Sequence, residues 1–193
     1  TSGSTGRPKG VQISHRAFTN FLESMRKEPG YSAGDVLLAV TTISFDIAGL
    51  ELLLPLYTGA TVCIALEPGN PESLLADLER YRPTVMQATP ATWKLLIAAG
   101  WKGDPHLKIL CGGEAIDTDL ARSLLVRSES LWNMYGPTET TIWSAVLPIE
   151  NAGDEAIPVG RPIQNTSFYV LDPSGQPVPQ GSPGELWIGG EGL

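Results

Sequence analysis

Short apolar runs alternate with amphipathic segments along most of the chain, and this alternation constrains its fold more than any other feature. The runs have the length and side-chain type of buried strands, and turn or capping residues separate them from the segments of helical type. Strands that alternate with helices form right-handed crossovers and lie side by side in a largely parallel sheet. We therefore predict an α/β fold, a largely parallel sheet flanked by helices. The predicted strands span residues 36–40, 60–65, 84–88, 107–111 and 131–135.

Capping residues indicate where the intervening helices begin. Ser14 is a candidate N-cap for a helix with apolar residues on one face. Asn70-Pro71-Glu72 has the usual order of a cap, a first-turn proline and an acidic residue. Asp46 is a candidate cap for a helix through residue 54, which Pro55 would bend or end. Further helices are expected from Pro90 and from Asp117 or Thr118.

The sequence pattern changes after Pro148. Residues 151–155 are polar, and the segments 168–171 and 185–188 are typical of antiparallel strands joined by turns. We expect residues 1–150 to form the α/β part and residues 151–193 to form the start of an antiparallel β subdomain. The chain has no initiator Met and ends at Leu193, just after Gly192, so we expect it to be a fragment of a longer enzyme.

Charge and composition argue against several kinds of partner. The formal net charge is −8, so a nucleic-acid partner is not expected. No signal peptide and no apolar run long enough to span a bilayer is found, so we expect no membrane partner. The two cysteines, Cys63 and Cys111, form no disulfide framework and suit a reducing cytosol. A cytoplasmic location is therefore expected.

The first ten residues have the composition of a loop that holds phosphate. Their glycines allow close backbone approach, and their hydroxyl groups and two cations supply hydrogen-bond donors. The spacing differs from that of a Walker A loop, because only two residues separate Gly3 from Gly6. A flexible polar linker is the alternative for this segment taken alone. The segment reads Thr1-Ser2-Gly3-Ser4-Thr5-Gly6-Arg7-Pro8-Lys9-Gly10.

A second candidate site follows the last predicted parallel strand. Tyr135 offers an aromatic face, Thr138 a hydroxyl group, and Glu139 a hard oxygen ligand suited to Mg²⁺. Gly136-Pro137 forces a turn that could bring these side chains together. Ligands of open α/β sheets bind beyond the carboxyl ends of the strands, where this segment is expected. Taken alone, the segment could also be an ordinary turn with polar surface residues.

Four segments together resemble the adenylate-forming enzymes, a family of acyl-CoA synthetases, luciferases and nonribosomal peptide synthetase adenylation domains. The first ten residues resemble the phosphate-loop signature, and residues 133–139 resemble the Asn-x-Tyr-Gly-Pro-Thr-Glu motif. Phe45-Asp46 resembles the Phe-Asp core of the peptide-synthetase subgroup, and residues 184–193 resemble the Gly-Glu-Leu motif near the end of the large domain. The resemblance therefore covers the whole chain, in the order of the family.

The resemblance implies that ATP and Mg²⁺ bind at the first two segments. Tyr135 would stack on adenine, and Asn133 would bond the adenine edge. Thr138 would contact the α-phosphate, and Glu139 would hold Mg²⁺. We expect catalytic contributions from Lys9, Thr138 and Glu139. The implied nucleotide-binding residues are Thr1, Ser2, Gly3, Ser4, Thr5, Gly6, Lys9, Gly113, Asn133, Tyr135 and Thr138.

The resemblance also implies an amino-acid substrate. The aspartate that matches Asp46 pairs with the α-ammonium group of the substrate in peptide-synthetase adenylation domains, although a helix cap is the alternative role. Met134 and Trp143 are bulky and Asp46 is the only charged pocket member, a combination that resembles glycine-type pockets of the family. Plain core packing is the alternative for the apolar members. The implied pocket comprises Asp46, Ile47, Leu50, Gln87, Leu110, Gly112, Met134, Ile142 and Trp143.

The predicted function is ATP-dependent formation of an aminoacyl-adenylate, with glycine as the expected amino acid. The aminoacyl group would then pass to the phosphopantetheine thiol of a peptidyl carrier domain, one of several synthetase modules expected as partners. An acyl- or aryl-CoA ligase is the nearest alternative, and Asp46 argues against it because those substrates carry no amino group. A nucleotide-binding fragment without catalysis is also possible, because the ribose-binding Asp and catalytic Lys of the family would lie beyond Leu193.

Overall fold

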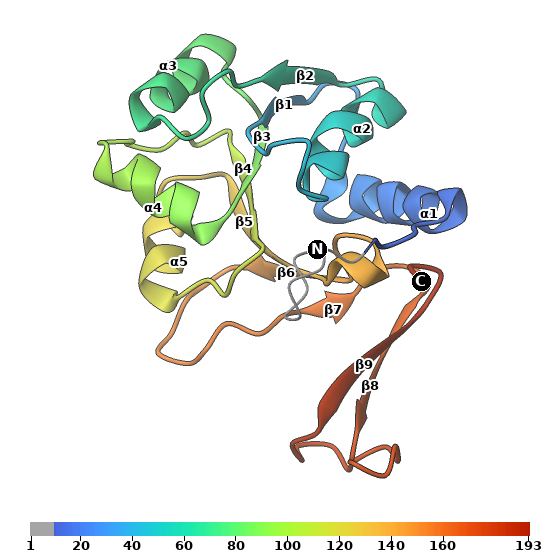
Figure 1. Cartoon of the computed structure of the whole chain (residues 1–193). Helices are drawn as coiled ribbons and strands as arrows, with labels where there is room; N and C mark the ends of the chain where they lie inside the picture. The colour runs from blue at the N-terminus through green and yellow to red at the C-terminus, as the bar shows by residue number, and fades with distance from the viewer. Residues whose placement is uncertain (1–9) are drawn as a thin grey trace.

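A computed structural model describes residues 10–193, and the predicted phosphate-loop residues 1–9, including Lys9, lie outside this range. The strands of the main sheet are β1 (Val36–Ala39), β2 (Thr61–Ile64), β3 (Val85–Ala88), β4 (Lys108–Gly112), β5 (Ser130–Tyr135), β6 (Ala145–Ile149) and β7 (Arg161–Pro162). They are arranged in the order β2-β1-β3-β4-β5-β6-β7 (Figure 1). Strands β1 to β5 pair in parallel, whereas β6 and β7 pair antiparallel. The predicted α/β fold with a largely parallel sheet is therefore confirmed.

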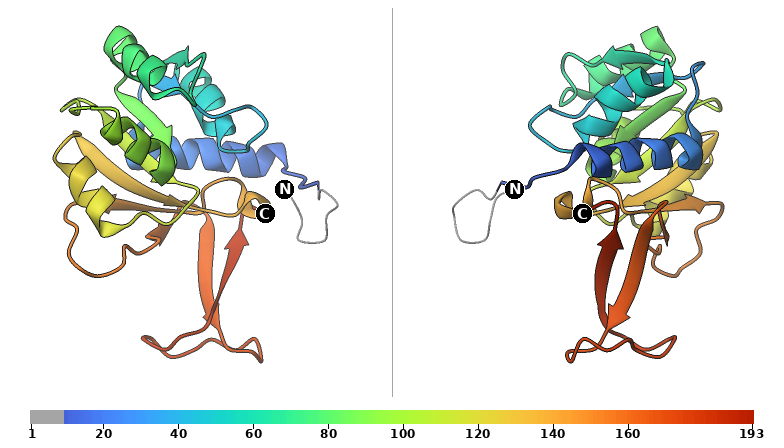
Figure 2. Two further views of the ribbon diagram at one scale, coloured as in Figure 1. Left: turned by 60° about the vertical axis from the view of Figure 1, so that its left-hand side comes forward. Right: turned by 90° about the vertical axis from the view of Figure 1, so that its right-hand side faces the viewer.

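Helices cover both faces of the main sheet (Figures 1 and 2). One layer contains α1 (His15–Met25) and α2 (Ala48–Thr58), and the other contains α3 (Pro71–Tyr81), α4 (Pro90–Ala98) and α5 (Thr118–Leu125). Successive side chains of a strand point to opposite faces, so Leu37 packs with the α1–α2 layer and Leu38 with the α3–α5 layer. Two apolar cores result, one on each face of the sheet.

Side-chain caps confirm three of the predicted helix starts, those at Ser14, Asn70 and Asp117, whose carboxylate accepts from the backbone N–H of Leu120 at 2.8 Å. The Ser14 hydroxyl oxygen accepts a hydrogen bond from the backbone N–H of Ala17 at 3.1 Å. The Asn70 side-chain oxygen accepts from the backbone N–H groups of Glu72 and Ser73 at 3.0 and 3.3 Å. The N–H groups of the first turn have no partner within the helix, and these caps satisfy some of them.

The prediction that Asp46 caps α2 was wrong. Ile47 occupies the N-cap position without a side-chain hydrogen bond, and the Asp46 side chain is engaged elsewhere. Of the two expected effects of Pro55, a bend or an end of the helix, the end does not occur, because α2 continues to residue 58 and is followed by Gly59 in the left-handed conformation. Proline removes one intrahelical hydrogen bond, but Leu54 and Pro55 are buried and their packing keeps the last turn in place.

Strand β2 lies at the edge of the sheet and is more exposed than the sequence suggested, with Ile64 59% exposed. Strands β6 and β7, which were not predicted, extend the sheet beyond β5. The pairing of β7 brings residues 161–162 into the main sheet, and the division of the chain near residue 150 stays a prediction. No helix within residues 10–193 is long and apolar enough to cross a membrane.

A separate antiparallel pair of strands, β8 (Thr166–Leu171) and β9 (Glu185–Gly190), projects from the main body as a long ribbon (Figures 1 and 2). Residues 172–175 form the expected turn, in which the Asp172 side chain accepts from the backbone N–H of Ser174 at 2.8 Å. The start of an antiparallel β section after the α/β part is therefore confirmed.

Candidate active site

Three segments converge at the carboxyl edge of the main sheet. The first follows β1 and leads through residues 40–47 into α2, the second follows β4 at Gly112-Gly113, and the third follows β5 at Gly136 (Figure 1). The hydroxyl group of Thr138, in the short helix η2 (Thr138–Thr140), donates a hydrogen bond to the Asp46 carboxylate. These residues are 92 positions apart in the chain. The contact brings the predicted amino-group ligand and the predicted phosphate ligand side by side.

The chain reverses sharply between β5 and β6. Glycine is required at position 136, because a Cβ there would lie 2.3 Å from the carbonyl oxygen of Ile142. Thr141 and Ile142 have φ values of 65° and 68°, a left-handed conformation that is unfavourable for β-branched residues. The Thr141 hydroxyl donates to the carbonyl oxygen of Gly192 at 2.7 Å, a contact that holds the strained turn. The turn directs Trp143 back over the end of β4, where it reaches the backbone of residue 112.

A pocket of about 350 Å³ lies beside the end of β5. The pocket is bounded by the segment after β4, by β5 and by residues 157–159. Among the predicted nucleotide-binding residues, Gly113, Asn133 and Tyr135 line it, whereas Thr138 lies outside it beside Asp46. Asn133 is buried, and its side-chain nitrogen donates to the carbonyl oxygen of Pro158 at 2.8 Å. At least one N–H of Asn133 therefore holds the wall of the pocket, and its bond to adenine stays a prediction.

Glu139 is exposed in η2, directly after Thr138. Within residues 10–193 it takes part in no ion pair, and no group of three or more His, Cys, Asp or Glu side chains is placed to hold a metal. Proteins usually bind Mg²⁺ through one or two carboxylates together with substrate phosphates and water. An accessible carboxylate at the strand end fits this pattern, so the predicted metal role of Glu139 remains compatible with its position.

Most residues of the predicted amino-acid pocket lie on the α1–α2 face of the sheet. Around Gly112 no open room remains, because a Cβ there would lie 2.6 Å from the Met134 carbonyl oxygen and 2.7 Å from the Trp143 ring. The two bulky residues of the predicted pocket, Met134 and Trp143, therefore fill the space beside Gly112. The members that share one apolar cluster are Ile47, Leu50, Leu110, Met134, Ile142 and Trp143.

A buried polar network crosses this apolar cluster. The indole N–H of Trp143 donates to the side-chain oxygen of Gln87 at 2.7 Å. The side-chain nitrogen of Gln87 donates to the carbonyl oxygen of Ile47 at 3.2 Å and to the carboxylate of Glu51 at 3.0 Å. Gln87 therefore connects the residue next to Asp46 with the aromatic ring that narrows the pocket.

Glu51 is the residue of this network that the sequence analysis missed. Its side chain is fully buried in α2 and accepts hydrogen bonds from the backbone N–H groups of Val40 and Thr41 and from the Thr41 hydroxyl. Burial raises the pKa of Glu51, while the hydrogen bonds from Thr41, Gln87 and Val40 act in the opposite direction. A single acidic residue within the apolar stretch 47–56 was the available signal.

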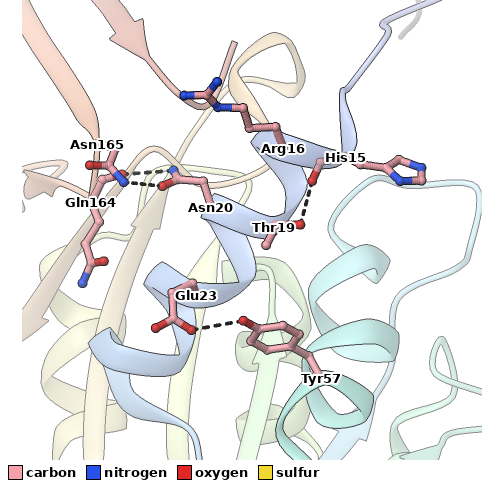
Figure 3. Close-up of a pocket in the computed structure, with 8 residues that line it drawn as sticks. All are labelled: His15, Arg16, Thr19, Asn20, Glu23, Tyr57, Gln164 and Asn165. Atoms are coloured by element: carbon pink, nitrogen blue, oxygen red, sulfur yellow. Dashed lines mark hydrogen bonds between the residues drawn. The ribbon is translucent and has the colours of Figure 1, made fainter.

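A second hollow, of about 440 Å³, lies between α1, Tyr57 of α2 and the segment before β8 (Figure 3). Its polar side chains bond to one another: Asn20 donates to the Gln164 carbonyl oxygen at 3.0 Å and accepts from Asn165 at 2.8 Å. Tyr57 donates to Glu23 at 3.3 Å, as Figure 3 shows. None of the predicted site residues lines this hollow, and its contacts join α1 to the chain that enters the β8–β9 ribbon.

Known proteins that are similar to this chain belong to the family that its motifs indicated. A family model described as "AMP-binding enzyme" matches residues 1–193. A PKS-NRPS hybrid synthetase of Aspergillus candidus is 47% identical over 196 residues, and a dimodular nonribosomal peptide synthase of Bacillus subtilis (strain 168) is 46% identical over 195 residues. Each alignment covers 100% of this chain but only 8% of the relative, so the chain spans a small part of the length of these proteins.

Solved structures show the same arrangement of elements. A four-domain nonribosomal peptide synthetase bound to AMP and glycine matches with a TM-score of 0.91 and 47% identity, over 96% of this chain and 14% of that chain. The N-terminal subdomain of Klebsiella oxytoca NpsA, in complex with 3-hydroxybenzoyl-AMSN, matches with a TM-score of 0.87 and 27% identity, over 100% of this chain and 51% of that chain.

Proposed function

The chain belongs to the AMP-binding enzyme family, as its motifs predicted, and we propose that it forms part of a nonribosomal peptide synthetase adenylation domain. In this proposal the complete protein joins the carboxylate of an amino acid to the α-phosphate of ATP and releases pyrophosphate. The observation that carries the proposal is the hydrogen bond between Thr138 and Asp46. It places a carboxylate suited to an ammonium group next to a hydroxyl suited to a phosphate oxygen.

In the proposed reaction, a substrate carboxylate oxygen bonds to the α-phosphorus while the bond from that phosphorus to the bridging oxygen of pyrophosphate breaks. Asp46 would hold the substrate ammonium and Thr138 would hold an α-phosphate oxygen. Because the two side chains are in contact, a small amino acid held at Asp46 has its carboxylate close to the phosphate. Mg²⁺ held by Glu139 would offset the negative charge of the phosphates.

Glycine is the proposed substrate. Trp143 and Met134 fill the space above Gly112, so little volume remains for a substrate side chain. The similar four-domain synthetase, whose structure holds AMP and glycine, also supports this choice. Overfilling a packed site costs about 1–3 kcal/mol, which is enough to reject larger amino acids. Alanine adds only one methyl group, and a pocket discriminates weakly at that scale.

Pyrophosphate exchange in the complete protein, with a panel of carboxylic acids, tests the proposal. We expect exchange with glycine, weaker exchange with alanine, and none with leucine, phenylalanine or charged amino acids. Preference for one of those larger amino acids would contradict the pocket argument. Exchange with a fatty or aryl acid such as 3-hydroxybenzoate would identify an acyl- or aryl-CoA ligase. No exchange with any acid would indicate a protein that binds the nucleotide without catalysing a reaction.

We further propose that the activated amino acid passes to the phosphopantetheine thiol of a peptidyl carrier domain. Support comes from the similar proteins, a hybrid synthetase, a dimodular synthase and a four-domain synthetase, of which this chain covers a small part. Carrier and neighbouring synthetase modules are therefore the proposed partners. Transfer of radiolabelled glycine to a phosphopantetheinylated carrier domain, and no transfer to the unmodified carrier domain, is the expected result.

The metal role of Glu139 gives a further prediction. Glu139→Ala is expected to lower Mg²⁺-dependent adenylation about tenfold or more, since one charge-assisted contact contributes about 1.5–3 kcal/mol. A Mg²⁺ titration of pyrophosphate exchange measures the effect. Glu150→Ala is the matched control, because Glu150 is an exposed carboxylate beyond the far end of β6. Identical Mg²⁺ dependence in both variants would remove the metal role from Glu139.

A further inference from the structure

We propose that Glu51 is a positioning residue that sets the shape of the amino-acid site, by holding the loop that leads to Asp46 and the Gln87 side chain at the same time. This inference rests on the proposed function. Glu51 does not line the nucleotide pocket and makes no hydrogen bond with Asp46, so it would act on the site from behind, through Gln87 and the loop.

The carboxylate of Glu51 accepts hydrogen bonds from two different parts of the fold. On the loop side, one oxygen accepts from the backbone N–H groups of Val40 and Thr41 at 2.8 and 2.9 Å. The other oxygen accepts from the Thr41 hydroxyl at 2.6 Å and from the Gln87 side-chain nitrogen at 3.0 Å. A single side chain of α2 therefore links the start of the loop 40–47, which leaves the end of β1, with the neighbouring strand β3.

Packing alone does not explain an acidic residue at this position. Leu50 and Leu54, its neighbours in α2, are buried and apolar, and a leucine at position 51 would be the ordinary choice for a buried helix face. Burying a carboxylate is costly unless hydrogen bonds compensate. The four groups that donate to Glu51 are uncharged N–H and O–H groups, and none is a cation. The carboxylate therefore acts as a hydrogen-bond acceptor for several groups and not as a partner in an ion pair.

The contact with Gln87 fixes the orientation of its side-chain amide. In the present orientation its oxygen faces the Trp143 N–H, and its nitrogen faces the Ile47 carbonyl and Glu51. Rotating the amide by half a turn would set two donors against each other at Trp143 and acceptor against acceptor at Ile47 and Glu51. Glu51 therefore stabilises the one orientation that holds the Trp143 ring over Gly112.

Glu51→Gln is the sharpest test, because it keeps the size of the side chain and replaces one accepting oxygen with a donating NH₂. In the complete protein we expect the KM for glycine to rise about tenfold, the equivalent of one lost buried hydrogen bond. The KM for ATP should remain within about twofold of wild type, and the preference for glycine over alanine should fall in kcat/KM. Thr41→Val, which removes one of the four donors, should shift glycine KM in the same direction by less.

Asp35→Asn is the matched control. Asp35 lies before the opposite end of β1 and also holds a loop, since it accepts from the backbone N–H and hydroxyl of Ser32 at 2.7 and 2.9 Å and from the Thr84 hydroxyl at 2.7 Å. This variant should lower thermal stability without changing the KM for glycine. If Glu51→Gln behaves in the same way, with wild-type glycine KM and wild-type selectivity, Glu51 is only structural and the proposal is wrong.

A spectroscopic measurement separates this inference from the proposed function. The measurement is fluorine NMR of protein labelled with 5-fluorotryptophan, in which the Trp143→Phe variant identifies the Trp143 resonance. Glu51→Gln should shift that resonance, and Asp35→Asn should not. An unshifted Trp143 resonance would overturn the link through Gln87. If the wild type activated no amino acid, the proposed function would fail, and the shift would still report whether Glu51 positions the indole.

Discussion

Replacing Asp46 with alanine is expected to cause the largest loss of activity of any single change at this site. A substrate ammonium that enters a desolvated pocket without its carboxylate partner loses about 2–5 kcal/mol of binding free energy. The kcat/KM for glycine in pyrophosphate exchange should therefore fall about thirtyfold to several thousandfold. The loss should appear in the KM for glycine. The dissociation constant of ATP should change little, since the link from Asp46 to the proposed phosphate ligand is the hydrogen bond from Thr138.

Two further variants separate the charge of Asp46 from its contact with Thr138. Asp46→Asn keeps an oxygen that can accept from the Thr138 hydroxyl but removes the charge, and it should lose nearly as much activity as Asp46→Ala. Thr138→Val removes the hydrogen bond and keeps the charge, and it should weaken ATP binding more than glycine binding. A fully active Asp46→Asn variant would show that the carboxylate does not bind the ammonium group.

The sequence predicted the parallel part of the fold well, because each buried strand is a short run of apolar residues between turn and capping signals. Strands β6 and β7 were missed for a physical reason. Pro148 interrupts the apolar pattern of β6, and β7 is only two residues long and includes Pro162. Proline removes a donor from a sheet, so its presence argues against a strand, yet an edge strand such as β7 tolerates it.

The motifs indicated which residues form the site but not which of their side chains are in contact. The bond between Thr138 and Asp46 joins segments far apart in the chain, and no local pattern predicts its geometry. The sequence marked Trp143 as a bulky pocket member, but only the strained turn at residues 141–142 shows that its ring lies against Gly112. Glu51 escaped notice because an acidic residue in a helix is ordinarily exposed, and only the buried donors around it reveal its role.

Trp143→Ala is expected to lower the stability of the protein strongly and to change the preferred amino acid. The indole is 1% exposed, and truncation of a buried tryptophan costs about 3–5 kcal/mol of the free energy of unfolding. The same truncation removes the ring that covers Gly112 and leaves the Gln87 oxygen without its donor. Kinetically, kcat/KM for alanine and serine should therefore rise relative to glycine, in a substrate panel measured by pyrophosphate exchange on the complete protein.

Trp93→Ala is the control that separates selectivity from stability. Trp93 is 0% exposed and packs against Trp101 on the opposite face of the sheet, with ring centroids 5.5 Å apart. Its removal should destabilise the protein by a similar amount, measured by denaturant unfolding, because a cavity of similar size is left in a comparable core. Glycine selectivity should nevertheless stay at the wild-type value, since Trp93 lies in the α3–α5 layer and the pocket lies in the α1–α2 layer. Equal selectivity in the two tryptophan variants would mean that the ring of Trp143 does not set the size of the amino-acid site.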